Sequence, residues 1–455
     1  MTVFKISDNS QIDKNAFVQV GHVTTKIADK TLEQLDREGV LIFPAIVGSD
    51  DLEEDQVILQ SVNDCYRTGN VMGYIGSGDE RLIIGSRFGN DGNDYFLQYL
   101  LGKVLNFPNV ADLQTDSNSD NRLLNLYVFL FPYYLHLALR KGMFKTYIRN
   151  EYNDANIKGP IDVARHIKVN TPFVGNIAYG RREYAYDNYL TELVRHTVEY
   201  IKKKPYGYNL LVKVKDEVQS IITHTPRFNS SDMRRIVTVN KQNPLRHAYY
   251  REYRMLQRLC LLILQHEKHQ IGVGSQQMHG ILFDGAWLWE EYINTLIKDE
   301  FYHPMNKVNK GAQRLFTDGS GIRNGLIYPD FLSRNDRPRI VADAKYRPIG
   351  NIGNSDYLQV LAYMYRFDAT IGFYLYPEEG EADDKCLWLN AGSTYESNVK
   401  ARNDVCVIKH GLKIPVEATT YDDFAASMHQ SESEFLKLIY KYVQVGNGST
   451  SVSKA

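Results

Sequence analysis

The chain has 455 residues, of which 43% are hydrophobic and 24% charged, and these values are typical of a globular protein with two or three domains. Its formal net charge is −1, so a nucleic-acid partner would have to contact basic residues gathered in one region. The cysteines Cys65, Cys260, Cys386 and Cys406 form no CxxC pair. This spacing argues against a zinc ribbon, an iron–sulfur cluster or a disulfide framework and favours a reduced, cytoplasmic protein.

No segment predicts export or membrane insertion. The first residues, MTVFKISDNSQIDK, lack a basic region followed by an apolar run. The most apolar stretch, Leu123 to Leu139, is interrupted by Asn125, Pro132 and His136 and is shorter than the roughly 20 apolar residues of a membrane span. We therefore expect a buried helix there and no membrane partner.

In chain order, residues 1–114 predict an α+β module, with short strand-like runs such as VLIFPAIV and RLIIGSRFG between Gly and Asp turns. The polar stretch TDSNSDN, Thr115 to Asn121, is the predicted linker. Residues 122–270 then predict a helical middle region, with helices over Leu123 to Lys141, Leu190 to Lys203 and Leu245 to Glu267.

Residues 280–445 predict an α/β region, because helix, strand, turn, strand, helix and strand follow one another after Asp284. The final residues, 446–455, offer nothing to pack and are predicted to form a flexible tail.

The segment GLIYPDFLSRNDRPRIVADAKYRPI predicts two strands joined by the turn SRNDRP. The period of two places Val341, Asp343 and Lys345 on one face of the second strand. With the turn centred near Asp336 and Arg337, Asp330 would face Asp343 on the neighbouring strand. Two facing carboxylates destabilise a strand pair unless a cation neutralises them.

A divalent cation would supply that charge. Hard oxygen ligands in small number favour Mg²⁺, with Mn²⁺ as the alternative, and we expect no His or Cys nearby to favour Zn²⁺. The opposing interpretation is a buried ion-pair network, which one lysine would leave with an uncompensated acid.

The preceding helix, DGAWLWEEYINTLIKDE, offers a third acid. Glu290 lies at the border of its apolar arc, beside Ile293 and Ile297, whereas Glu291 points away and is expected to be a solvated surface residue.

Together these residues resemble a PD-(D/E)xK nuclease core: Glu290 on a helix, Pro329 and Asp330, the run Asp343-Ala344-Lys345, and Gln359 with Tyr363 on the next helix. The resemblance implies that Asp330 and Asp343, with Glu290 and the carbonyl of Ala344, hold Mg²⁺. It also implies that Lys345 orients or helps to deprotonate the attacking water, and that Gln359 and Tyr363 brace the site or contact the DNA backbone.

The surroundings of this segment are cationic. Between Phe301 and Gly350 the acids are Asp318, Asp330, Asp336 and Asp343, and the basic residues outnumber them. Arg347 is the basic residue expected to support the site or the DNA backbone, and the others are Lys307, Lys310, Arg314, Arg323, Arg334, Arg337, Arg339 and Lys345. Phosphate contacts require such a patch.

The whole chain resembles the McrC family, including LlaJI-like restriction subunits. The upstream motifs that carry the resemblance are GYIGSGDERLIIGSRFG, YIRNEYNDANIKGPIDVARHI and REYAYDNYLTELVRHTVEYI, in that order before the nuclease core. The resemblance implies a Mg²⁺-dependent endonuclease acting on double-stranded DNA, with an N-terminal module that docks on an AAA+ McrB-like NTPase hexamer and stimulates it. The partner would bind GTP or ATP, and this chain carries no GxxxxGK[ST] loop of its own.

Two other functions remain open. A non-cleaving adaptor would activate the NTPase and keep only the nuclease fold, and a stand-alone RecB-like repair nuclease would share the core but need no partner. The sequence does not distinguish a methylated from an unmodified target.

Overall fold

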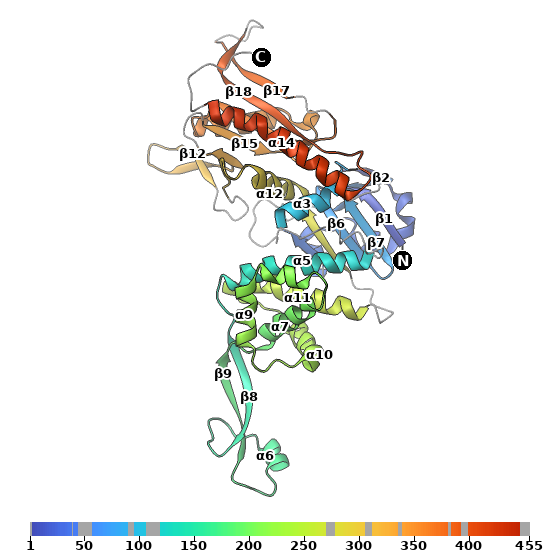
Figure 1. Cartoon of the computed structure of the whole chain (residues 1–455), viewed down its shortest axis with the longest axis vertical. Helices are drawn as coiled ribbons and strands as arrows, with labels where there is room; N and C mark the ends of the chain where they lie inside the picture. The colour runs from blue at the N-terminus through green and yellow to red at the C-terminus, as the bar shows by residue number, and fades with distance from the viewer. Residues whose placement is uncertain are drawn as a thin grey trace. The chain divides into compact units, whose positions relative to one another are not determined.

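A computed structural model describes residues 2–38, 40–43, 57–89, 95–105, 119–269, 278–304, 312–334, 339–380, 384–392 and 399–445. The chain forms two compact units (Figure 1). The first unit combines Met1–Thr115 with Gly274–Ala455, and the middle unit is Asp116–Val273. The predicted helical region 122–270 falls within the middle unit, whereas the predicted regions 1–114 and 280–445 share the first unit.

The N-terminal part of the first unit contains a five-stranded sheet in the order β1-β7-β6-β10-β3. The strands are β1 (Thr2–Ser7), β3 (Val40–Phe43), β6 (Val71–Ser77), β7 (Glu80–Gly85) and β10 (His279–Asp284). Strand β10 pairs antiparallel with β6 and parallel with β3. The boundary predicted at residue 280 assigned this strand to the C-terminal region, but the structure places it in the N-terminal sheet.

A glycine permits this pairing. A Cβ built on Gly73 would lie 2.1 Å from the carbonyl oxygen of Ile281, and the φ angle of Gly73 is +143°, so no other residue fits here without strain.

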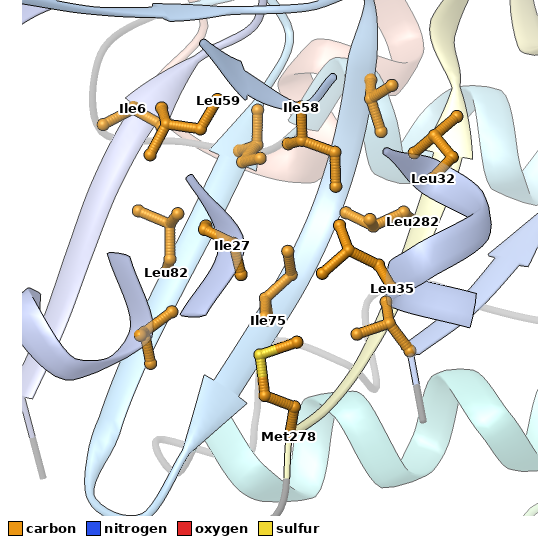
Figure 2. Close-up of a cluster of buried hydrophobic side chains, with 14 of the residues drawn as sticks. Ile6, Ile27, Leu32, Leu35, Ile58, Leu59, Ile75, Leu82, Met278 and Leu282 are labelled. Atoms are coloured by element: carbon orange, nitrogen blue, oxygen red, sulfur yellow. The ribbon is translucent and has the colours of Figure 1, made fainter. Parts of the chain in front are cut away.

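Short helices and a second sheet cover one face of this sheet. The helices are η1 (Lys14–Val20), α1 (Gly21–Ile27) and α2 (Leu32–Glu38), and the second sheet consists of β2 (Gln11–Asp13), β5 (Cys65–Thr68) and β4 (Leu59–Val62). Figure 2 shows their buried aliphatic side chains meeting in one cluster, which includes Met278 and Leu282 from beyond residue 274. The N-terminal module therefore depends on a strand supplied from the C-terminal part of the chain.

The middle unit contains the three predicted helices. They are α5 (Ser119–Leu139), α7 (Tyr189–Lys202) and α11 (Arg251–His269), joined by α8 (Gly207–Val212), α9 (Lys215–His224), η2 (Ser230–Asp232), α10 (Met233–Gln242) and η3 (Ala248–Tyr250). The face of α7 that carries Leu190, Leu193, Val194 and Ile201 is buried. The predicted linker lies outside the described residues up to Asn118 and is helical from Ser119, and the predicted tail 446–455 also lies outside them.

A β-hairpin in the middle unit was not predicted. Strands β8 (Thr146–Asp154) and β9 (Ile177–Ala185) pair along their whole length, with α6 (Val163–Val169) between them in the chain. Their residues are mostly polar or exposed, so the alternation that marks a half-buried strand is weak.

The C-terminal part of the first unit contains a six-stranded sheet in the order β11-β14-β15-β16-β18-β17. The strands are β11 (Phe301–Tyr302), β14 (Phe331–Ser333), β15 (Ile340–Ala344), β16 (Ile371–Glu378), β17 (Lys385–Ala391) and β18 (Lys400–Lys413). Strands β15, β16 and β18 run parallel, while β11 and β14 and also β17 are antiparallel to their neighbours. The predicted order of α/β elements is thus present, with β11 and a hairpin, β12 (Gln313–Thr317) and β13 (Arg323–Ile327), inserted before β14.

Helix α13 (Asn354–Arg366) connects β15 to β16 and packs on the sheet face that carries Val341 and Tyr374. Gly372 lets the helix approach closely, because a Cβ at this position would lie 2.8 Å from Val360 and from Met364. The remaining helices of the first unit are α3 (Tyr95–Leu105), α12 (Gly285–Ile297) and α14 (Tyr421–Val445). Within the part of the chain that the structure describes, no helix is both long and apolar enough to cross a membrane.

Candidate active site

The two predicted acids face each other where β14 and β15 pair: Asp343 lies in β15, and Asp330 immediately precedes β14. Strands β14 and β15 pair antiparallel with Phe331 opposite Ala342 and Leu332 opposite Val341, and the same register, extended by one residue, sets Asp330 opposite Asp343. The backbone N–H of Ala344 donates a hydrogen bond of 2.8 Å to Asp330 Oδ2. The predicted turn residues Asp336 and Arg337 lie outside the described residues, but the register of the strands agrees with the prediction.

The environment of these acids makes their negative charge costly. Burial raises the pKa of Asp330 well above its usual value, and the neighbouring carboxylates of Glu290 and Asp343 raise it further. Burial also raises the pKa of Asp343, against the opposing effect of Lys345. One ammonium is therefore insufficient to balance the acids in this region.

Lys345 lies at the centre of the site. Its Nζ is 2.7 Å from Asp343 Oδ2 and 3.5 Å from Asp356 Oδ1, and it donates a hydrogen bond of 3.1 Å to Gln359 Oε1. Burial lowers the pKa of Lys345, but the surrounding carboxylates outweigh this and raise the pKa above its usual value. The side chain is therefore a cation, suited to orient a water or phosphoryl oxygen.

Gln359 and Tyr363 brace this arrangement from α13. Gln359 Nε2 donates to the hydroxyl of Tyr363 over 2.7 Å, and that hydroxyl donates to the carbonyl of Tyr328 over 3.1 Å. Tyr328 precedes Asp330 by two residues. These hydrogen bonds therefore link Lys345, through Gln359 and Tyr363, to the segment that leads into Asp330.

The sequence did not predict the role of Asp356. This buried residue, in the first turn of α13, accepts a hydrogen bond of 3.0 Å from the backbone of Gly353. It also lies 2.5 Å from the guanidinium of Arg347. Arg347, predicted to support the site or the DNA backbone, is thus held by Asp356. An acid near a helix N-terminus was the signal that could have identified it.

A histidine lies beside the two acids, so the prediction that no histidine is nearby was wrong. His303 Nδ1 donates to the carbonyl oxygen of Asp330 over 2.8 Å, and its ring stacks on Phe331. It is close because β11 pairs with β14, a contact that sequence spacing does not reveal. Burial lowers the pKa of His303, but Glu291, Glu290 and the Asp330 carbonyl raise it overall.

The two helix acids both approach His303. Its Nε2 lies 3.8 Å from Glu290 Oε1 and 3.6 Å from Glu291 Oε1. The side chain of Glu290 is 15% exposed and that of Glu291 is 29% exposed. Glu290 is the more buried of the two, as expected, but the prediction that Glu291 is a solvated surface residue was wrong.

The donor set fits a hard divalent cation better than a structural zinc site. Among the described residues, no group of three or more His, Cys, Asp or Glu side chains has the spacing of a complete metal site. Two facing carboxylates and the backbone at Ala344 offer oxygen ligands and leave positions for water, as Mg²⁺ requires. Asp343 Oδ2 is buried and, within the described residues, lacks a hydrogen bond of normal geometry despite its short ion pair with Lys345.

The fold and the site together define an α/β protein with a cluster of acids and one lysine at the paired strands β14 and β15 of a mixed sheet and on the helices α12 and α13. Comparison with known proteins extends this description. A family described as "McrBC 5-methylcytosine restriction system component" matches residues 66–377, so the chain belongs to this family. This confirms the prediction made from the sequence.

Two solved structures from Thermococcus gammatolerans are similar to this chain. One is a refined half-complex from a tetradecameric assembly of McrB AAA+ hexamers with bound McrC, with 14% identity, coverage of 96% of this chain and 100% of that chain, and a TM-score of 0.46. The other is a cryo-EM structure of the McrBC complex, with 13% identity, coverage of 65% and 87%, and a TM-score of 0.31. No curated protein matches the chain.

Proposed function

We propose that the chain is the nuclease subunit of an NTP-dependent restriction system and that it hydrolyses phosphodiesters of double-stranded DNA at a PD-(D/E)xK-type site with Mg²⁺. The observation that carries this proposal is the register that sets Asp330 opposite Asp343, with Lys345 2.7 Å from Asp343. Membership of a family described as a restriction system component supports it.

The acids of the site would hold the cation. Asp330 and Asp343, with Glu290 and the carbonyl of Ala344, are the oxygen donors, and His303 fixes the backbone at Asp330. When bound, Mg²⁺ supplies a lowered pKa for the attacking water and positive charge for the phosphoryl oxygens. The raised pKa values of Asp330 and Asp343 agree with a site that requires such a charge.

Lys345 would act by position and charge. Gln359 and Asp356 restrict its ammonium from one side, which leaves its protons directed toward the acids and toward a phosphate held beside them. Because its pKa is raised, we assign it the orientation of water and the stabilisation of charge rather than the removal of a proton.

The second part of the proposal concerns the partner. We infer that the chain acts with an AAA+ McrB-like NTPase hexamer that binds GTP or ATP, and that the N-terminal module, residues 1–114, docks on it. Membership of the family described as a McrBC restriction system component supports a partner of this kind.

The test is DNA cleavage by the chain together with a McrB-like NTPase, in the presence of Mg²⁺ and GTP or ATP. Asp330→Asn and Asp343→Asn should abolish cleavage and retain stimulation of NTP hydrolysis. Asp404→Asn, an exposed acid on β18 of the same sheet, is the matched control and should cleave normally. Full activity of the Asp343→Asn variant would indicate an adaptor, and full cleavage without NTP or partner would indicate a stand-alone nuclease.

A further inference from the structure

The hairpin of β12 and β13, here the ribbon, stands out from the C-terminal sheet (Figure 1) and exposes large apolar side chains. Phe316 is 64% exposed, Ile322 61% and Leu326 48%. An isolated two-stranded hairpin is marginally stable in water, and exposed apolar residues on such an element commonly mark an interaction surface. The ribbon therefore presents a surface that its own fold does not require.

One face of the ribbon combines cationic, aromatic and amide groups. Arg314 pairs with Leu326 across the strands and Phe316 pairs with Asn324, so these four side chains share one face, and all four residues are exposed. A second exposed arginine near the tip, Arg323, pairs with Thr317 and therefore points to the opposite face of the ribbon.

The ribbon is held rigidly at both ends. At its tip, Asp318 Oδ1 accepts hydrogen bonds from the backbone of Ser320 and Ile322 over 2.9 and 2.8 Å. At its base, Leu315 and Ile327 pack in the core beneath α13, and Arg366 Nε donates to the carbonyl of Arg314 over 2.8 Å. A surface that is already ordered loses little conformational entropy when it binds a partner.

The balance of charge favours a polyanion. Asp318 is the one acid between Gln313 and Ile327. Its carboxylate accepts hydrogen bonds within the turn at the tip, and these hydrogen bonds lower its pKa. Arg314 lies toward the base of the ribbon, four residues before that acid, whereas Arg323 follows the turn and pairs with Thr317 beside it. The two arginines favour a polyanion, because each can contact a phosphate.

The ribbon also leads directly to the candidate active site. Strand β13 ends at Ile327, and Asp330 follows it by three residues, which span at most about 11 Å. A ligand that lies along the ribbon therefore reaches the facing acids without a long gap.

We propose that the ribbon lies in a groove of the double-stranded DNA substrate beside the phosphodiester that is cut. Arg314 and Arg323 contact phosphates, and Phe316 and Leu326 contact sugars and base edges. The major groove of DNA admits a two-stranded β-ribbon, and Asn324 on the same face is a side chain that hydrogen-bonds to adenine edges. The inference rests on the proposed function in that duplex DNA is taken as the substrate.

The test measures binding of the full chain to a fluorescent DNA duplex in EDTA, so that no cleavage occurs, over a series of salt concentrations. The double variant Arg314→Ala/Arg323→Ala should weaken binding at low salt at least tenfold. It should also reduce the slope of log affinity against log salt by about 2, since each phosphate contact contributes about 0.9. Phe316→Ala should weaken binding and leave the slope unchanged.

Two further variants serve as controls. Arg67→Ala removes an exposed arginine from β5 and should bind as wild type does, with the same slope. Arg314→Lys/Arg323→Lys keeps both charges and should retain the wild-type slope. Circular dichroism confirms folding of each variant.

Wild-type affinity in the double alanine variant, or the absence of duplex binding by the wild-type chain, would overturn the proposal. Loss of NTPase stimulation with unchanged DNA affinity would also overturn it and assign the ribbon to a protein partner. Ribbon-dependent DNA binding by a chain that does not cleave even with its partner would refute the proposed function and leave this inference standing. Normal cleavage together with DNA binding that does not depend on the ribbon would refute this inference and leave the proposed function standing.

Discussion

Tyr346, the residue after Lys345, is anchored in the N-terminal module. Its hydroxyl lies 2.7 Å from Ser86 Oγ, its ring packs edge-on against Phe88, and the guanidinium of Arg87 lies 4.8 Å from the ring centroid. Tyr346 is 5% exposed and Ser86 is 8% exposed. Burial raises the pKa of Tyr346 well above its usual value, so its hydroxyl stays protonated. We expect this anchor to set the position of Lys345.

The expected losses in the free energy of unfolding follow from these contacts. Tyr346→Phe should lower the free energy of unfolding by about 1 kcal/mol, the usual net value of a buried hydrogen bond. Ser86→Ala also removes the hydrogen bond of 3.1 Å from the backbone of Phe88 to Ser86 Oγ and should lower it by about 2 kcal/mol. Because both changes remove the same bond, the double variant should lose less than the sum, with a coupling energy of about 1 kcal/mol. Tyr346→Ala removes the ring as well and should cost about 3–5 kcal/mol.

Tyr346→Ala should affect the rate of cleavage more strongly than it affects stability. The backbone of Lys345 is fixed by hydrogen bonds from its N–H to Leu375 and from Arg347 to its carbonyl, both of 2.9 Å, and loss of the neighbouring ring would let this segment shift. A displacement of about 1 Å at a catalytic group can cost about 100-fold in rate. We therefore expect Tyr346→Ala to lower kcat by up to that factor and to change KM little.

The assay pairs urea unfolding with DNA cleavage in the presence of the NTPase partner. If Tyr346→Ala fails to fold, Tyr346→Leu retains an apolar side chain and takes its place. Tyr253→Phe in the middle unit loses a comparable hydrogen bond, 2.7 Å to the carbonyl of Gly142, and should cleave normally. A folded Tyr346→Ala variant with wild-type kcat, or stability losses that simply add, would refute the reasoning.

Three further predictions concern other buried groups. His303→Ala removes the hydrogen bond to the carbonyl of Asp330 and should weaken Mg²⁺ binding about tenfold, as calorimetry would show; unchanged affinity would contradict its positioning role. Burial raises the pKa of Asp8 to about 6, so the folded state holds this proton more tightly and the free energy of unfolding should fall as pH rises from about 4 to about 6. Compared with Asp8→Asn, the wild type should lose about 3 kcal/mol over that interval in urea unfolding, and a difference independent of pH would be inconsistent with this account. Glu432 accepts hydrogen bonds of 2.7 and 2.8 Å from two buried tyrosine hydroxyls, so Glu432→Ala should lower the stability of the first unit by about 3 kcal/mol, and a loss under 1 kcal/mol would contradict this.

The central geometry of the site could be predicted because it is local. Few residues separate the two strands in the sequence and side chains alternate in a strand, so the sequence alone predicted that Asp330 faces Asp343. Helical periodicity likewise predicted that Glu290 is more buried than Glu291. Each of these inferences needed one element or one hairpin and no knowledge of the sheet order.

The remaining features depend on contacts between elements that are distant in the sequence. His303 reaches Asp330 because β11 is the edge strand beside β14, and β10 completes a sheet whose other strands precede it by almost 200 residues or more. No pattern within a strand indicates which sheet it joins. The hairpin of β8 and β9 was missed for another reason, since its strands are rich in polar residues and lack a clear apolar alternation.

The claim that Asp330 and Asp343 jointly hold Mg²⁺ is tested most directly by calorimetric titration of the full chain with Mg²⁺ near neutral pH. We predict saturable Mg²⁺ binding by the wild-type chain that is lost in both Asp330→Asn and Asp343→Asn. We also predict that the wild-type chain alone gains stability with Mg²⁺, by about 2.7 kcal/mol at about 100 times the Kd. Equal Mg²⁺ affinity in the wild type and in both variants would contradict the account.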